Sequence, residues 1–145
     1  MNGIFNARLV WDSDPAERLD KAQKYVDSEC LRMMKPYTPF RTGIMEKSAT
    51  LGTVIGSGKI MYNSPYARYQ YYGVVYGPNI PLYENGVLVG FRSPKGKKKH
   101  ATDRQLQYST AKHPQAQRLW FETMKKKHGQ AILRGAAAIT GGKVE

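Results

Sequence analysis

The strongest constraint on the fold is an amphipathic pattern of helical period that lies between two prolines, Pro15 and Pro36. Apolar residues recur there at spacings of three and four positions, which places them on one face of a helix. Asp14 can cap this helix, Pro15 suits its first turn, and Glu17 completes a capping-box pattern. We therefore predict a helix over about 15–35. Its apolar face contains Leu19, Ala22, Val26, Cys30, Met33 and Tyr37.

A second pattern of helical period lies near the C-terminus and begins after Pro114, which suits a first helical turn. Three lysines, residues 125–127, lie largely on its polar side, and Gly141 and Gly142 end it. We predict a C-terminal helix whose apolar face packs on a sheet. That face contains Phe121, Met124, His128, Ile132, Gly135 and Ile139.

The residues between the two helices favour β-structure. Apolar alternation on either side of Gly56–Gly58 predicts two strands joined by a tight reversal. The dipeptide Asn85–Gly86, typical of hairpin turns, predicts a second pair, Leu82–Tyr83 with Val87–Phe91, and 105–108 can form a short return strand. The predicted fold is α+β: an N-terminal helix, an antiparallel sheet of about four strands with a long basic loop, and a C-terminal helix packed on the sheet. The first strand pair would contain Ala49, Leu51, Thr53 and Ile55 on one strand and Ile60 and Tyr62 on the other.

Five tyrosines lie within twelve residues, 62–73, beside a single arginine. Tyr66, Tyr69 and Tyr72 recur every three residues, which predicts one or two helical turns that end at Gly73. A base-stacking platform usually interleaves aromatic and basic residues on a sheet face, so this spacing favours packing instead. We expect the cluster to anchor this turn against the N-terminal helix and to leave aromatic edges available to a neighbouring subunit.

The net charge of +12, from 23 Lys and Arg against 11 Asp and Glu, predicts attraction to nucleic acid, an acidic protein surface or an anionic membrane. The segment 92–104, "RSPKGKKKHATDR", is rich in positive charge and has no apolar periodicity, so we predict an exposed loop. Such a loop can contact phosphates without reading a base sequence. The candidate contact residues are Arg92, Lys95, Lys97, Lys98, Lys99 and Arg104.

The length of 145 residues predicts a single domain, 1–145. Within it we expect an N-terminal arm at 1–14, an extended hairpin and basic loop at 78–112, and a flexible tail at 141–145. The sequence contains no apolar run long enough to span a membrane and no signal-peptide pattern at its start. Its single cysteine, Cys30, excludes an internal disulfide, so we expect the protein to be made and used in a reducing cytoplasm.

The sequence shows no recognisable catalytic or metal-binding motif. His100, His113 and His128 are separated along the chain, and none lies in a metal-ligand pattern. We therefore expect no catalytic residue, metal, cofactor or small-molecule ligand, and we expect His128 to be a packed, hydrogen-bonded residue. Two alternatives stay open. One is a small basic nuclease, which needs little more than a histidine, a glutamate and a lysine, and the other is a non-specific nucleic-acid-binding protein outside any virion.

An ordered set of short motifs resembles one known family. A P-x-x-T-G turn is followed by an aromatic "PYA…YG" segment and then by "WFE" near the start of the last helix. In this order the motifs resemble those of the minor capsid proteins of tailed phages, the small head–tail connector or tail-completion (neck) proteins. In that family the turn leads into a strand. The residues that carry the resemblance are Pro39, Thr42, Gly43, Pro65, Tyr66, Ala67, Tyr72, Gly73, Trp120 and Phe121.

The resemblance implies a non-enzymatic structural protein that forms a homo-oligomeric ring between portal and tail, with phage double-stranded DNA passing through the lumen. It implies other copies of the chain, adjacent neck or portal-adaptor proteins and tail-terminator proteins as partners. It also implies a location at the head–tail junction of the virion, after assembly in the host cytoplasm. The long excursion 78–112 would then reach a neighbouring subunit or face the lumen.

Overall fold

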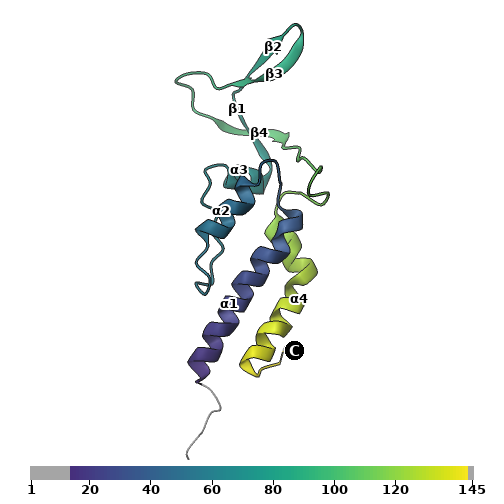
Figure 1. Ribbon diagram of the computed structural model, residues 1–145. Coiled ribbons are helices and arrows are strands. Elements are labelled where there is room, and N and C mark those ends of the chain that lie inside the picture. The colour runs from purple at the N-terminus through teal and green to yellow at the C-terminus, as the bar shows by residue number, and fades with distance from the viewer. Residues whose placement is uncertain (1–13, 144–145) are drawn as a thin grey trace, which may run out of the picture.

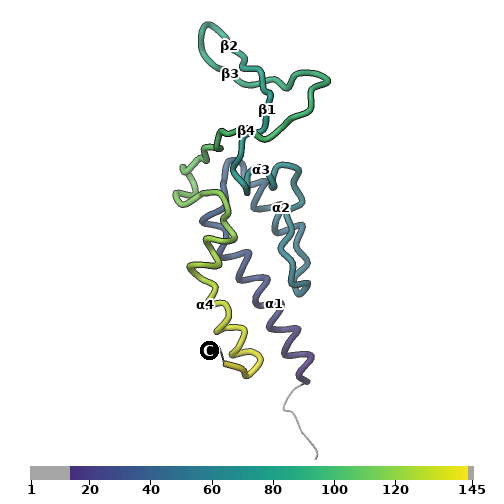
Figure 2. Tube along the Cα trace, turned by 180° about the vertical axis from the view of Figure 1, so that it is seen from behind, coloured from purple at the N-terminus to yellow at the C-terminus, as the bar shows by residue number. Residues whose placement is uncertain are grey.

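The computed structural model describes residues 14–143, so residues 1–13 of the expected arm and 144–145 of the expected tail lie outside the described part. Two long antiparallel helices, α1 and α4, form the body, and α2 and α3 lie near the C-terminal half of α1 (Figure 1). The strands extend from the end of the body that is opposite the C-terminus (Figure 2). The elements are α1 Pro15–Met34, a 3₁₀ turn Lys35–Tyr37, α2 Ile44–Gly52, α3 Ala67–Tyr72, β1 Val74–Gly77, β2 Ile80–Glu84, β3 Val87–Arg92, β4 His100–Gln105 and α4 Trp120–Thr140.

The α+β class is confirmed, but the elements are arranged differently from the prediction. Helix α4 packs along α1 rather than on a sheet. The strands form two separate two-stranded ladders, β1–β4 and β2–β3, instead of one four-stranded sheet. Two strands offer too little surface to cover a helix of 21 residues, so the two long helices bury their apolar faces against each other.

The close approach of α1 and α4 depends on a glycine. The ring and hydroxyl of Tyr25 on α1 occupy the space that a Cβ atom would take at Gly135 on α4. Farther along the same pair, the Tyr37 hydroxyl lies 3.0 Å from Nε2 of His128, which confirms that His128 is packed and hydrogen-bonded. The fully buried hydrophobic core beside these contacts consists of Met34, Tyr37, Trp120, Met124 and Ile132.

Helix α1 begins as predicted, but its first turn is stabilised differently. Asp14 accepts a hydrogen bond from the backbone N–H of Ala16 at 3.0 Å. Glu17 forms an ion pair with Lys21 at 2.9 Å instead of closing a capping box. Leu19, predicted on the apolar face, is 63% exposed, because the buried face passes instead through Ala22, Asp27 and Met34. The prediction of Leu19 as a core residue is therefore wrong.

The predicted strand pair around Gly56–Gly58 is also wrong. Residues Ile44–Gly52 form α2, and an irregular loop follows up to α3. Gly43 begins the helix with φ of +78°, a conformation that favours glycine. After the helix, Oγ1 of Thr53 accepts from the N–H of Met61 at 3.0 Å and donates to the carbonyl of Met61 at 3.3 Å. A threonine side chain thus makes the contacts that a second strand would have made.

The hairpin predicted at Asn85–Gly86 is confirmed. Both residues have positive φ, and β2 pairs with β3 on either side of them. The return strand lies earlier than predicted, because β4 covers His100–Gln105 and pairs with β1. The exposed loop that was expected over 92–104 is therefore shorter and lies between β3 and β4. Residues 105–108 continue past β4, where Tyr108 donates a hydrogen bond to the carbonyl of Gln70 on α3.

Helix α4 begins at Trp120, six residues after the proline at which it was predicted to start. The intervening segment is held in irregular form by two backbone hydrogen bonds. The N–H of Gln117 donates to the carbonyl of Tyr37 at 3.1 Å, and that of Leu119 donates to the carbonyl of Tyr71 at 2.9 Å. The helix ends at Gly141, which has φ of +79°, as the sequence predicts.

Substitution of Gly135 by alanine is expected to destabilise the protein. In a helix interior, alanine is favoured over glycine by about 1 kcal/mol, but here the added methyl group overlaps Tyr25, and overpacking costs about 1–3 kcal/mol. Gly129→Ala is the matched control, because its Cβ would lie an ordinary 3.7 Å from the Lys125 side chain. Thermal unfolding should show a lower Tm for Gly135→Ala and an unchanged or higher Tm for Gly129→Ala. Equal rises in both variants would contradict the close contact.

Candidate functional site

Trp120 lies at the meeting point of three segments and is 1% exposed. Its indole N–H donates to the Tyr62 hydroxyl at 2.8 Å. The rings of Tyr62 and Tyr71 both meet the indole edge to face, with centroid separations of 5.7 and 4.9 Å. Burial raises the pKa of Tyr62, so its hydroxyl stays neutral at physiological pH and can accept this bond. The tryptophan therefore ties the loop before α3, and α3 itself, to the first turn of α4.

The packing tyrosines differ from the predicted ones. Tyr66 and Tyr72 are 69% and 55% exposed, whereas Tyr62 and Tyr71 contact Trp120. The helical turn that ends at Gly73 is confirmed as α3. The expectation that this cluster packs is thus met by two tyrosines outside the three-residue repeat. Within the repeat, Tyr69 meets the ring of Tyr76 edge to face at 4.7 Å.

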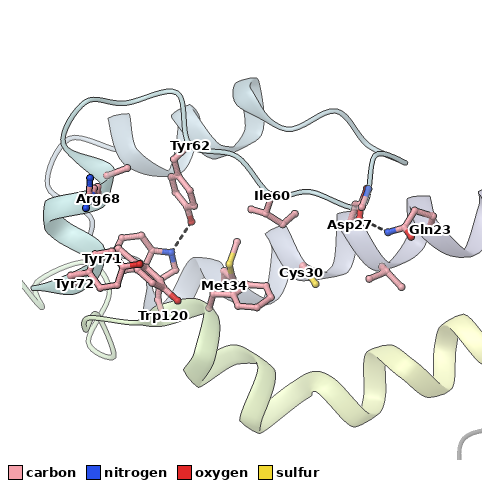
Figure 3. A pocket seen from close by; sticks show the side chains of 14 residues that line it. Gln23, Asp27, Cys30, Met34, Ile60, Tyr62, Arg68, Tyr71, Tyr72 and Trp120 are labelled. Atoms are coloured by element: carbon pink, nitrogen blue, oxygen red, sulfur yellow. Dashed lines mark hydrogen bonds between the residues drawn. The ribbon is translucent and has the colours of Figure 1, made fainter.

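An apolar groove of about 540 Å³ opens beside this tryptophan (Figure 3). Its walls come from α1, from the loop residues 58–62, from α3 and from the first turn of α4. Gln23 and Asp27 line it at one end and Arg68 at the other, as Figure 3 shows. The groove therefore exposes half-buried apolar side chains such as Val26, Cys30 and Ile60, whereas Met34 and Trp120 stay buried. The apolar lining includes Val26, Cys30, Met34, Ile60, Tyr71 and Trp120.

A buried carboxylate holds one wall of the groove in place. Asp27, 3% exposed, accepts hydrogen bonds at Oδ2 from the backbone N–H groups of Gly56 and Gly58, at 2.7 and 3.1 Å. Its Oδ1 accepts from the side-chain amide of Gln23 at 2.8 Å. Both glycines have positive φ, which lets nearby N–H groups converge on one anion. Sequence reasoning missed this role, although an aspartate on the buried side of an amphipathic helix was a usable signal.

The hairpin β2–β3 is a projecting, largely uncovered structure. Every residue of its strands is exposed except Gly90, which is intermediate. Cross-strand partners share a face, and the register pairs Pro81 with Phe91 and, beyond a register shift that leaves Val89 without a partner, Tyr83 with Leu88. These four residues, which we call the apolar hairpin face, are all exposed, Tyr83 to 63% and Phe91 to 61%. The opposite face of the hairpin also carries exposed apolar side chains, Ile80, Leu82 and Val87. An isolated two-stranded hairpin is marginally stable in water, and no element of residues 14–143 covers this one.

The candidate phosphate-contact residues lie at the base of this hairpin. Arg92 ends β3, Arg104 lies in β4, and the lysines lie in the loop between those strands. All six are exposed, and none forms an ion pair with a carboxylate within residues 14–143. The structure therefore brings them together as one unneutralised basic segment. The lysines are Lys95, Lys97, Lys98 and Lys99.

The residues of the family resemblance separate into two groups. Pro39, Thr42, Gly43 and Tyr66 line a second cavity, of about 510 Å³, between the start of α2 and the segment 107–109. The turn at Gly43 leads into α2, not into the strand that the resemblance implied. A second group lines the apolar groove. This group is Ala67, Tyr72, Trp120 and Phe121, while Pro65 and Gly73 lie just before and just after α3.

Three residue types that suit a nuclease do meet in one place. Nε2 of His113 lies 4.0 Å from Glu46, which in turn pairs with Lys35 at 3.2 Å. Nδ1 of the same histidine donates to the carbonyl of Thr38 at 2.7 Å, and its ring lies against Phe40. Both ring nitrogens thus face groups of the protein itself. The arrangement connects the segment before α4 to the segment between α1 and α2.

The described residues contain neither a candidate metal cluster nor a candidate membrane span. Among residues 14–143, no group of three or more His, Cys, Asp and Glu side chains could hold a metal ion. In the same part of the chain, no helix has the length and apolar character needed to cross a membrane. The two cavities and the basic segment are accordingly the features on which a function can be argued.

Gly73→Ala is expected to destabilise the protein more than Gly96→Ala. Both glycines have positive φ, at +69° and +74°, so each substitution costs about 1–2 kcal/mol in backbone strain. Only at position 73 would the new methyl group also clash, at 2.7 Å from the Tyr108 hydroxyl and 3.1 Å from Cβ of Arg118. Chemical denaturation of both variants measures the difference. Equal losses would show that the contact with Tyr108 is not tight.

The chain was compared with protein-family models, with curated proteins and with solved structures. None of the three comparisons found a match. The assignment of a function therefore depends on the geometry described above and on the motif resemblance.

Proposed function

We propose that this chain is a structural subunit of a tailed-phage virion, of the minor capsid or head–tail connector (neck, tail-completion) type. In this proposal it forms a homo-oligomeric ring at the head–tail junction, and double-stranded DNA passes through the ring. Its other partners are the adjacent neck or portal-adaptor proteins and the tail-terminator protein. The proposal assigns no catalysis and no cofactor. The observation that carries it is the apolar hairpin face, whose side chains are exposed. It belongs to a hairpin that projects from the body (Figure 1).

The total surface of the chain supports assembly with other subunits. The chain exposes 11384 Å², whereas a compact monomer of 16.4 kDa exposes about 7,500 Å². Even with about 160 Å² set aside for each of the fifteen residues outside 14–143, an excess on the order of 1,500 Å² remains. A subunit in a ring makes two contacts, and a standard contact covers about 800 Å² on each partner. The excess is therefore close to what ring formation would cover.

The basic segment supports a role beside DNA. Its side chains end in exposed, unpaired positive charges at the base of the hairpin, where they can contact phosphates without reading bases. The hairpin and the basic loop within the segment 78–112 then have different partners. The hairpin contacts a neighbouring subunit, and the segment from Arg92 to Arg104 faces the lumen. The same segment favours the alternative function, a non-specific nucleic-acid-binding protein outside the virion.

Disruption of the gene in its phage tests the proposal directly. Without a neck subunit, heads filled with DNA cannot join to tails, so negative-stain electron microscopy should show free heads beside free tails. Complementation with the intact gene is the control and should restore joined particles. Normal infectious particles in the disrupted phage would remove the neck assignment and favour the free nucleic-acid-binding protein.

Removal of two loop lysines is expected to weaken DNA binding and its salt dependence. Lys97→Ala/Lys98→Ala removes two phosphate contacts, so the slope of log K against log salt should fall by about 2. The matched control, Lys125→Ala/Lys126→Ala, removes the same charge from exposed positions on α4 and should leave the slope nearly unchanged. Fluorescence anisotropy with duplex DNA over a salt series measures both. A larger fall in the α4 variant would move the DNA contact to that helix.

A further inference from the structure

The apolar hairpin face and the apolar groove are two uncovered surfaces on one chain. The face presents Tyr83, Leu88 and Phe91 with Pro81, and the groove is lined by side chains that are only half-buried, among them Val26, Cys30 and Ile60. Covering apolar surface and so removing it from water is favourable by about 25 cal/mol per Å² of area buried. A single contact that joins the two surfaces would cover both at once.

We propose that the hairpin of one copy inserts its apolar face into the groove of the next copy, and that this contact joins the subunits of the ring. The inference rests on the proposed function, because it specifies the contact between subunits of that ring. A second copy is the occupant because the β1–β4 ladder carries the hairpin away from its own body (Figure 1). The hairpin therefore reaches a groove that belongs to another molecule.

The two surfaces match in length. Strand β2 has five residues and spans about 17 Å at 3.4 Å per residue. The α1 side of the groove extends from Gln23 to Met34, which is about 18 Å at 1.5 Å per residue. The floor of the groove is apolar and aromatic, and the hairpin face presents two aromatic rings and a leucine. Aromatic side chains of this kind are typical of the central part of protein interfaces.

The charges at the ends of the two surfaces are complementary. Arg68 lies at the α3 end of the groove and forms no ion pair with a carboxylate in residues 14–143. Glu84 lies beside the hairpin turn and likewise forms no ion pair within this range. If the hairpin tip points toward α3 of the next copy, these two side chains come together. That orientation fixes the direction of the contact as well as its place.

The contact is head-to-tail, since the two surfaces lie on different parts of the chain. Head-to-tail contacts between identical copies produce closed rings when the rotation between copies allows closure. A contact between two hairpins would instead stop at a dimer and would leave the groove uncovered. The geometry therefore favours the hairpin-in-groove contact over the hairpin-to-hairpin contact.

The natural cysteine gives a direct test. Cys30 lines the groove and is the only cysteine in the chain, so a second cysteine on the hairpin can be joined to it across the contact. Leu88→Cys places a thiol on the apolar hairpin face, and a short bismaleimide then links the two thiols. Burial, with the nearby carboxylates of Asp27 and Glu29, raises the pKa of Cys30, so the reaction is run at mildly alkaline pH. Raised salt screens the repulsion between chains of charge +12.

The expected result is a ladder of dimers, trimers and larger products on a denaturing gel, because every copy carries both reactive groups. The ladder should disappear in Leu88→Cys/Cys30→Ala. It should also be absent in Val87→Cys, the matched control, because residues 87 and 88 point to opposite faces of the strand. Tyr83→Cys, on the same face as Leu88, should reproduce the ladder. This second variant keeps the test valid if Leu88→Cys does not fold correctly.

Three results would overturn the contact. Dimers that persist in Leu88→Cys/Cys30→Ala would show that hairpins meet each other. Equal ladders from Leu88→Cys and Val87→Cys would show that the apolar face has no special partner. No product at high protein concentration would show that the hairpin of one copy does not enter the groove of another. If electron microscopy shows rings but cross-linking gives no ladder, this contact alone is overturned. If cross-linking gives the ladder but disruption of the gene leaves the phage normal, the proposed function alone is overturned.

Discussion

The contacts of Trp120 determine how the other segments of the body are arranged. The indole is buried between Tyr62 of the long loop and Tyr71 of α3, and it donates its only N–H to the Tyr62 hydroxyl. Because the backbone of Leu119 also donates to Tyr71, the first turn of α4 is attached to α3 by both side chain and main chain. The position of α3 in turn sets where β1 leaves the body, since Gly73 connects the two. The direction of the projecting hairpin thus follows from the burial of one tryptophan.

The same packing explains why the body has an open groove. Asp27 fixes Gly56 and Gly58 against α1, and Trp120 fixes Tyr62 against α4, so the loop is anchored at both ends. Between these anchors Ile60 is the loop residue that reaches the core. One side chain over a stretch of this length leaves the core partly uncovered. Hydrogen bonds at both ends of the loop, together with the packing of Ile60 and Tyr62 on the core, hold the outer wall of the groove in place.

The parts of the fold that could be predicted from the sequence depend on local signals. The start of α1 at Asp14, the turn at Asn85–Gly86 and the end of α4 at Gly141 follow from capping and turn chemistry within a few residues. The predictions were wrong where the structure of a segment depends on contacts with residues outside that segment. Thr53 bonds to Met61 and removes the need for a strand pair, and Asp27 is buried by loop glycines about thirty positions away. Which tyrosines pack depends on Trp120, about fifty residues farther along. The candidate site was predicted in part, because exposed lysines are visible in a sequence, whereas a groove formed by four segments is not.

The symmetry of a ring links the two halves of the proposal. In a cyclic assembly every copy has the same surroundings, so a head-to-tail contact through the hairpin places the base of each hairpin at the same height in the ring. The segment from Arg92 to Arg104 begins at that base, because β3 leads directly into the basic loop. A single loop with a few exposed cations binds DNA weakly, but a circle of such loops presents all its charges to one duplex at once. In the proposed ring, the contact that joins the subunits would therefore also align their charges around the DNA, which would be a physical reason for the apolar face and the basic segment to lie next to each other in the chain.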